Sequence, residues 1–75
     1  MRTTLDTLKK GDIGVILGFD ADKIPLKLVE MGCLPNNWVQ VVQIAPFGDP
    51  IYLNINESYV AIRKETAQFI EIELH

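Results

Sequence analysis

The side chains that most often carry out chemistry in enzymes are few and scattered in this sequence. Its 75 residues contain one cysteine, Cys33, and one histidine, His75, which is the last residue. Nucleophilic and general acid–base catalysis need a nucleophile and a base within hydrogen-bonding reach of each other, and a chain end normally frays. The sequence therefore predicts no catalytic residues, and we expect that the protein is not an enzyme.

Sites for metals or cofactors are equally hard to find. The nearby carboxylates of Asp20 and Asp22 could begin a calcium loop, but its later oxygen ligands and its closing glutamate are missing. The spacing of Gly11, Gly14 and Gly18 matches neither of the common phosphate-binding motifs. We read these residues as a solvated loop and as glycines of turns and strand bends. The sequence predicts no metal site and no bound cofactor.

The lone thiol and the large aromatic side chains leave alternatives open. A single cysteine allows no intramolecular disulfide and no zinc-finger spacing, so we expect Cys33 to pack as a small apolar residue beside Leu34. A reactive or metal-binding thiol is the alternative. Trp38 and Tyr52 could stack on a ligand, but in so small a domain we expect core or half-buried positions for both.

Charge and hydropathy exclude several classes of partner. The net charge is −3 and 48% of the residues are hydrophobic, but no apolar stretch approaches the roughly 20 residues that a membrane-spanning helix needs. Lys9-Lys10 and Arg63-Lys64 are the only clustered cations, too few to drive binding to nucleic acid. The N-terminal segment lacks the apolar centre of a secretory signal. We predict a cytoplasmic protein with no direct membrane insertion and no nucleic-acid partner.

Residue patterns along the chain predict short elements joined by tight turns. A helix that begins with Pro25 at its first position should end near Met31, because Gly32 can adopt the left-handed conformation and Pro35 cannot continue the helix. Runs that are rich in β-branched residues or that alternate with period two predict strands. The expected elements are a helical turn over Thr4–Lys9, strands over Ile13–Gly18, Trp38–Ile44, Ile51–Asn56, Tyr59–Arg63 and Phe69–Leu74, a polar loop over Phe19–Lys23, a five-residue turn over Pro46–Pro50, and a helical turn over Lys64–Gln68.

Five short strands in a chain of this size must curl. An open flat sheet would leave two edges and one apolar face uncovered. We therefore predict one domain over residues 1–75, mainly all-β, folded as a small SH3-like five-stranded barrel with one or two short helices. An OB-type barrel, which also has five strands, is the second choice.

The predicted helix offers a candidate surface for a partner. Leu26 and Val29 should lie off the face that Leu28 and Met31 turn to the core, which would leave an exposed apolar patch. In the alternative, the curved first strand covers both faces of the helix. Taking the patch as real, the predicted partner-binding residues are Leu26, Lys27, Val29, Glu30 and Met31.

Four motifs in order resemble a known family over essentially the whole chain. They are Leu5-x-x-Leu8-x-x-Gly11, the segment Leu26–Pro35, the turn Ala45–Pro50 and the segment Val60–Ala67. Together they resemble the ferrous iron transport protein A family. The resemblance implies a cytosolic SH3-like protein with a non-catalytic accessory role in bacterial ferrous iron uptake, whose partner is the large membrane transporter with a cytosolic GTPase domain.

The resemblance has limits and a rival. Lys27 stands where an arginine is common in the family, which loses a planar fork of donors. Asn36-Asn37 replaces a Pro-Gly type of turn, but asparagine tolerates the left-handed conformation, so we expect the turn to survive. The same barrel resembles the C-terminal domain of iron-dependent repressors, so the alternative function is a regulatory or peptide-binding SH3-like domain. Edge strands can pair between copies, which allows a weak homo-oligomer.

Overall fold

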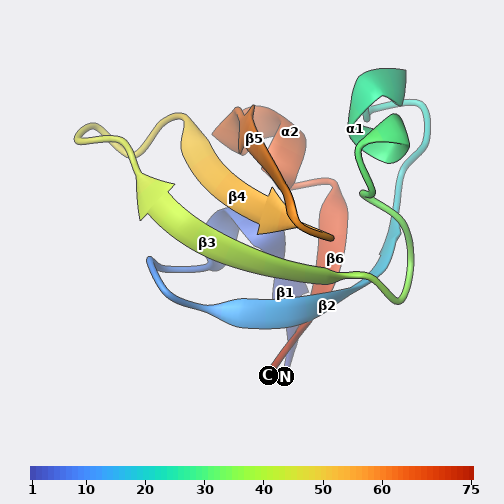
Figure 1. Cartoon of the computed structure of the whole chain (residues 1–75), viewed down its shortest axis with the longest axis horizontal. Coiled ribbons are helices and arrows are strands. Elements are labelled where there is room, and N and C mark those ends of the chain that lie inside the picture. The colour runs from blue at the N-terminus through green and yellow to red at the C-terminus, as the bar shows by residue number, and fades with distance from the viewer.

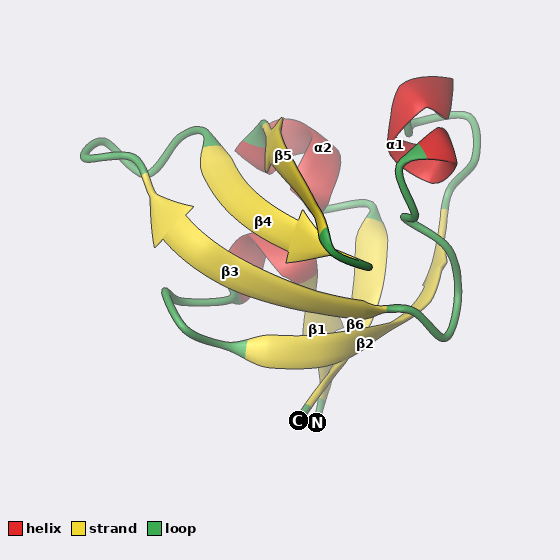
Figure 2. Cartoon of the chain, in the orientation of Figure 1, coloured by secondary structure: helices red, strands yellow, loops and turns green.

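A curved β-sheet makes up most of the molecule (Figure 1). The computed structural model describes residues 1–75 and contains one antiparallel sheet with the strand order β1-β6-β2-β3-β4-β5. The strands are β1 (Arg2–Thr4), β2 (Ile13–Phe19), β3 (Trp38–Ile44), β4 (Ile51–Ile55), β5 (Ser58–Ile62) and β6 (Ile70–Leu74). A 3₁₀ turn (Leu5–Thr7) and the helices α1 (Leu26–Glu30) and α2 (Lys64–Ala67) complete the chain (Figure 2). None of these helices has the length and hydropathy that crossing a bilayer would require.

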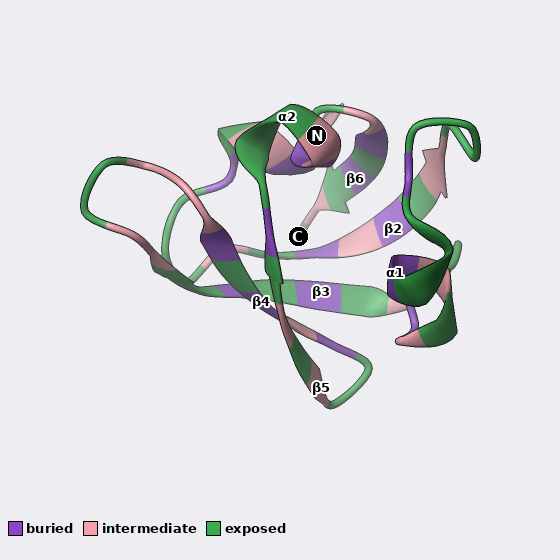
Figure 3. Ribbon diagram, turned by 90° about the horizontal axis from the view of Figure 1, so that it is seen from above, coloured by how far each residue is buried: buried purple, intermediate pink, exposed green.

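The core lies inside the curl of the sheet. Alternation with period two turns Ile51, Leu53 and Ile55 of β4 inward, while Tyr52 stays exposed. Buried bands recur in the same way along β2, β3 and β6 (Figure 3). Fifteen buried residues form one cluster: Leu5, Leu8, Ile16, Ile24, Leu28, Cys33, Val39, Val41, Ile51, Leu53, Ile55, Ile62, Ala67, Ile70 and Ile72.

Glycine allows β2 to curve and to lie close to β6. A Cβ added at Gly14 would lie 2.5 Å from Cγ2 of Ile72 and 2.8 Å from the backbone oxygen of Glu73. The pairing of β2 with β6 shifts register between Ile16 and Gly18, which marks a bulge. The prediction that these strand glycines mark a bend or a close backbone approach is confirmed.

The mainly antiparallel β class is confirmed, but the predicted number of strands was wrong. The structure has six strands because Arg2–Thr4 pairs with β6, with Arg2 opposite Glu73. This strand has no apolar alternation, and it is held by backbone pairing and by an exposed ion pair of 3.2 Å between Arg2 and Glu71. A three-residue polar segment carries no local signal for a strand.

The boundaries of several predicted elements also needed correction. Phe19 belongs to β2 rather than to the following loop, and the first helical turn is shorter than Thr4–Lys9. Pro25 has an extended ψ of 138° and precedes α1 as its N-cap, so it does not occupy the first helical position. The strand over Trp38–Ile44 was predicted with its observed bounds.

Candidate functional site

Helix α1 is held by its C-terminal end, which packs against the hairpin of β4 and β5. Gly32 has a φ of 109°, and the backbone N–H groups of Gly32 and Cys33 donate to the carbonyls of Val29 and Leu28, both at 3.0 Å. A Cβ added at Gly32 would lie 3.1 Å from Cβ of Asn56 in the hairpin turn. The predicted left-handed glycine is therefore confirmed, and it lets the end of α1 approach β4 and β5 closely.

Two asparagines stabilise the turn that follows α1. Asn36 has a φ of 76°, and the side-chain amide of Asn37 donates a 2.8 Å hydrogen bond to the carbonyl of Gly32. The prediction that an asparagine turn survives in place of the Pro-Gly turn is confirmed. Together these contacts fix the position of α1 relative to the sheet.

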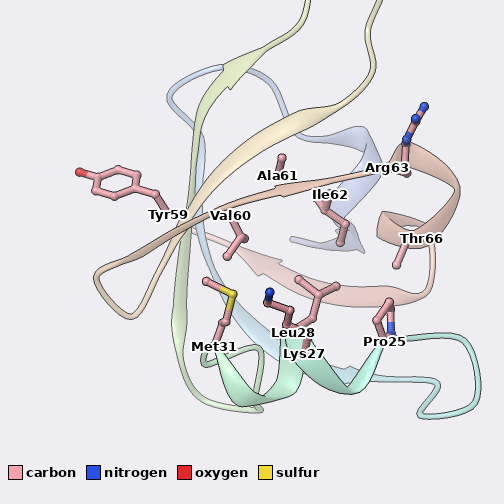
Figure 4. Close-up of a pocket in the computed structure, with 10 residues that line it drawn as sticks. All are labelled: Pro25, Lys27, Leu28, Met31, Tyr59, Val60, Ala61, Ile62, Arg63 and Thr66. Atoms are coloured by element: carbon pink, nitrogen blue, oxygen red, sulfur yellow. The ribbon is translucent and has the colours of Figure 1, made fainter.

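A groove of about 480 Å³ separates α1 from β5 (Figure 4). Leu28 and Met31 form part of one wall, and Val60 and Ile62 point from β5 toward α1. Tyr59 and Ala61 contribute to the other wall but point away from the helix. The full lining consists of Pro25, Lys27, Leu28, Met31, Tyr59, Val60, Ala61, Ile62, Arg63 and Thr66. A concave, mostly apolar surface of this size is the usual form of a binding site.

The five residues predicted to bind a partner do not all face this groove. Lys27 and Met31, one turn apart on α1, line it together. Leu26 lies outside the groove and is 71% exposed, and Glu30 is exposed as well. Val29 is half-buried and packs on the core, so the expected exposed patch lacks this side chain.

Sequence reasoning missed the half of the groove that β5 and α2 provide. The predicted strand over Tyr59–Arg63 does alternate, with Val60 and Ile62 on the inner face of β5, and Ile62 is buried in the core. What the pattern did not contain was the position of α1 opposite this strand. Only the packing of α1 on the β4–β5 hairpin brings the two walls together.

The charged groups of the groove are both cations. Lys27 is exposed and makes no ion pair. Arg63 lies 3.7 Å from Oδ2 of Asp49, whose Oδ1 accepts a 3.0 Å hydrogen bond from the backbone N–H of Lys64 at the start of α2. No carboxylate lines the groove. Its electrostatic preference is therefore for a ligand with negative charge.

The β4–β5 hairpin also carries a smaller apolar depression of about 240 Å³, lined by Val42, Tyr52, Leu53, Tyr59, Val60 and Ala61. The expectation that Trp38 and Tyr52 are core or half-buried residues was wrong, because they are 49% and 42% exposed. Trp38 meets the ring of His75 edge-on, with centroids 5.0 Å apart. Both aromatics occupy positions on the outer face of their strands, opposite the residues that fill the core.

The structure contains no group of three or more His, Cys, Asp or Glu side chains that could hold a metal ion. Asp20 and Asp22 lie in a turn in which the backbone N–H of Asp22 donates a 3.1 Å hydrogen bond to Oδ1 of Asp20. Such a bond is typical of an Asx turn. The Asp20 carboxylate therefore stabilises the turn in which both residues lie.

Cys33 lies fully buried in the core, so its predicted packing as a small apolar residue is confirmed. Burial raises the pKa of the thiol to about 11 because it disfavours the thiolate. At pH 8 only about one thiol in a thousand would be ionised.

We expect a disulfide reagent to label Cys33 of the folded protein at least about a hundredfold more slowly than it labels the urea-unfolded chain. Absorbance of the released thiolate measures both rates, and rapid labelling of the folded protein would contradict the prediction.

Comparison with known proteins places the chain among a defined set of relatives. The model of the FeoA domain matches residues 3–74. An Fe(2+) transport protein A/Fe(2+) transporter FeoB fusion protein of Porphyromonas gingivalis (strain ATCC BAA-308 / W83) is 38% identical over 71 residues, which cover 93% of the chain. The chain spans only 8% of the length of that relative.

Solved structures resemble the whole fold. The crystal structure of an iron uptake regulatory protein (FeoA) has a TM-score of 0.85 and 28% identity, covering 100% of this chain and 99% of the other. The Stenotrophomonas maltophilia FeoA complexed with zinc, described as a procaryotic SH3 domain protein, has a TM-score of 0.81 and 22% identity, covering 95% and 89%. The predicted SH3-like fold is confirmed by this likeness.

Proposed function

The chain belongs to the FeoA domain family, and from this premise we propose that it is a cytoplasmic accessory protein of ferrous iron uptake that binds the cytosolic GTPase part of a membrane transporter. As a member of this family the protein is non-catalytic, in agreement with the sequence prediction. It then contributes to uptake by binding to the transporter and orienting it, and not by catalysis.

The observation that carries the proposal is the fused relative. In that protein a segment similar to 93% of this chain shares one polypeptide with an Fe(2+) transporter. Fusion holds two domains at a high effective concentration, which favours contacts that separate chains must form by association. A separate chain of the same family would need a surface that holds it on the transporter.

The groove between α1 and β5 is the surface that we assign to this contact. It combines apolar walls at Met31 and Val60 with the cation Lys27, and apolar centres bordered by charge are typical of protein interfaces. Leu26 and Glu30 stand on the exposed side of the same helix and could extend the contact beyond the groove. Val29 contributes indirectly, because its half-buried side chain packs on the core and so holds α1 in place.

An NMR titration tests the proposal. Labelled protein is titrated with the isolated cytosolic GTPase region of the transporter, with and without guanine nucleotide, and we expect amide shifts confined to α1 and β5. Met31→Glu places a charge among the apolar side chains of the groove and should weaken binding by about tenfold or more. Gln40→Glu, an exposed change of equal charge on β3 outside the groove, should leave binding unchanged.

Two results would contradict this assignment. One is the absence of shifts in every nucleotide state, which would indicate that the partner is another protein or another part of the transporter. The other is an equal loss of binding in Met31→Glu and Gln40→Glu, which would mean that overall charge and not the groove controls association.

A further inference from the structure

Strand β5 is a free edge of the sheet, and its hydrogen-bonding groups can be assigned from the hairpin. The two turn residues Asn56 and Glu57 have φ values of 49° and 69°, as a two-residue type I′ turn requires. In such a hairpin the pair that closes the turn, Ile55 and Ser58, exchanges both backbone hydrogen bonds, and alternate pairs then repeat this pattern. Val60 and Ile62 therefore bond to β4.

The intervening residues Tyr59 and Ala61 must direct their N–H and C=O groups to the other side of the strand. No strand pairs with β5 on that side, because β5 ends the strand order. Backbone hydrogen bonds outside the regular strands and helices involve neither residue. The edge thus presents two donors and two acceptors in the geometry that a new strand would complete.

The free edge borders the groove. Tyr59, Val60 and Ala61 all line it, opposite α1 (Figure 4). A strand laid along β5 would turn every second side chain toward α1, where Leu28 and Met31 form an apolar wall. Backbone bonds would supply affinity and the groove would select side chains, as in other cases of strand addition.

We propose that β5 binds an extended segment of a partner protein as an added strand, with alternate apolar side chains in the groove and a carboxylate beside Lys27. The proposal rests on the proposed function, because it describes how that partner would be held.

Charge favours a partner segment over a second copy of this chain. The charged lining residues Lys27 and Arg63 are cations, and Lys27 has no ion-pair partner. A second β5 would bring the segment Ser58–Lys64, which contains no acidic residue and ends in two cations. An acidic and apolar segment complements the groove, whereas a second β5 adds charge of the same sign.

The test uses a blocked synthetic peptide in which valine alternates with threonine and which ends in aspartate, with a control peptide that ends in lysine. Binding to the full chain is followed by NMR. We expect the aspartate peptide to bind about threefold to tenfold more tightly than the lysine peptide at low salt, with the difference lost at high salt. Saturation should slow amide hydrogen exchange at Tyr59 and Ala61 but not at Tyr52.

A pair of variants separates backbone from side-chain recognition. Ala61→Pro removes the outward N–H without touching a bond to β4, and proline is tolerated on edge strands. It should weaken peptide binding by about tenfold or more. Ala61→Val changes the side chain but keeps the N–H, so it should lose much less binding than Ala61→Pro does. If Ala61→Pro does not fold, the exchange measurement on the unchanged protein decides the question.

Several outcomes would overturn strand addition: no binding of the aspartate peptide, unchanged exchange at Tyr59 and Ala61 under saturation, or full binding by folded Ala61→Pro. Protection of the same amides without peptide, by self-association that dilution reverses, would make the occupant a second copy.

Failure of this inference can be distinguished from failure of the proposed function. If Met31→Glu but not Ala61→Pro abolishes binding of the GTPase region, strand addition fails and the proposed function stands.

The reverse result is equally distinct. Peptide binding that depends on Ala61, together with no binding of the GTPase region, would uphold the added strand and reject the transporter as its source.

Discussion

Gly14→Ala should lower the free energy of unfolding by about 3 kcal/mol or more. The new Cβ would lie 2.5 Å from Cγ2 of Ile72 and 2.8 Å from the backbone oxygen of Glu73. A side-chain methyl can move, but the oxygen belongs to β6 and moves only with the strand. For a domain of this length the total stability is only about 4–11 kcal/mol, so the change would shift the melting temperature by roughly 12–24 °C.

Gly18→Ala on the same strand is the matched control. No atom lies within 4 Å of a Cβ at Gly18, and its backbone lies outside the left-handed region. We expect a change within about 1 kcal/mol, with either sign, because alanine also reduces the entropy of the unfolded chain. Urea unfolding followed by circular dichroism measures both variants. Equal stabilities would mean that β2 and β6 lie farther apart than the structure shows.

Leu28→Ala should cost about 2–4 kcal/mol and should also weaken partner binding. Leu28 is the buried side chain of α1, 8% exposed, and it both joins the core and forms part of the groove wall. Removing it leaves a cavity under a helix of five residues, which is too short to be stable without tertiary contacts. We therefore expect α1 to loosen and the groove to lose one wall.

Leu26→Ala gives the comparison within the same helix. Leu26 is 71% exposed, so its truncation should change stability by less than about 0.5 kcal/mol. Thermal unfolding and NMR titration with the GTPase region, applied to both leucine variants, separate anchoring from contact. Equal destabilisation by the two substitutions would show that α1 packs on a different face.

The leucine pair bears on function as well as on stability. Leu28 is buried in the core and lines the groove, so it holds α1 against the sheet. A groove with a fixed width needs this contact, because a binding surface built on elements held by packing loses less entropy when it is occupied. Loss of binding in Leu28→Ala should therefore exceed the loss in Leu26→Ala.

Local patterns determined much of this protein. The β-branched run of β3, the alternation of β4 and β6, and the glycine that ends α1 all carry their signals within a few residues, because strand period and turn chemistry depend on neighbours in the chain. For the same reason the motifs were sufficient to identify the family. Two of the five predicted partner-binding residues, Lys27 and Met31, also face the groove.

Only the tertiary structure decided the rest. Arg2–Thr4 becomes a strand because β6, almost the whole chain away, offers it an edge. The groove exists because β5 ends the sheet and α1 packs opposite it. Which strand stays unpaired and which surface stays uncovered depend on contacts between distant segments, and no local pattern contains that information.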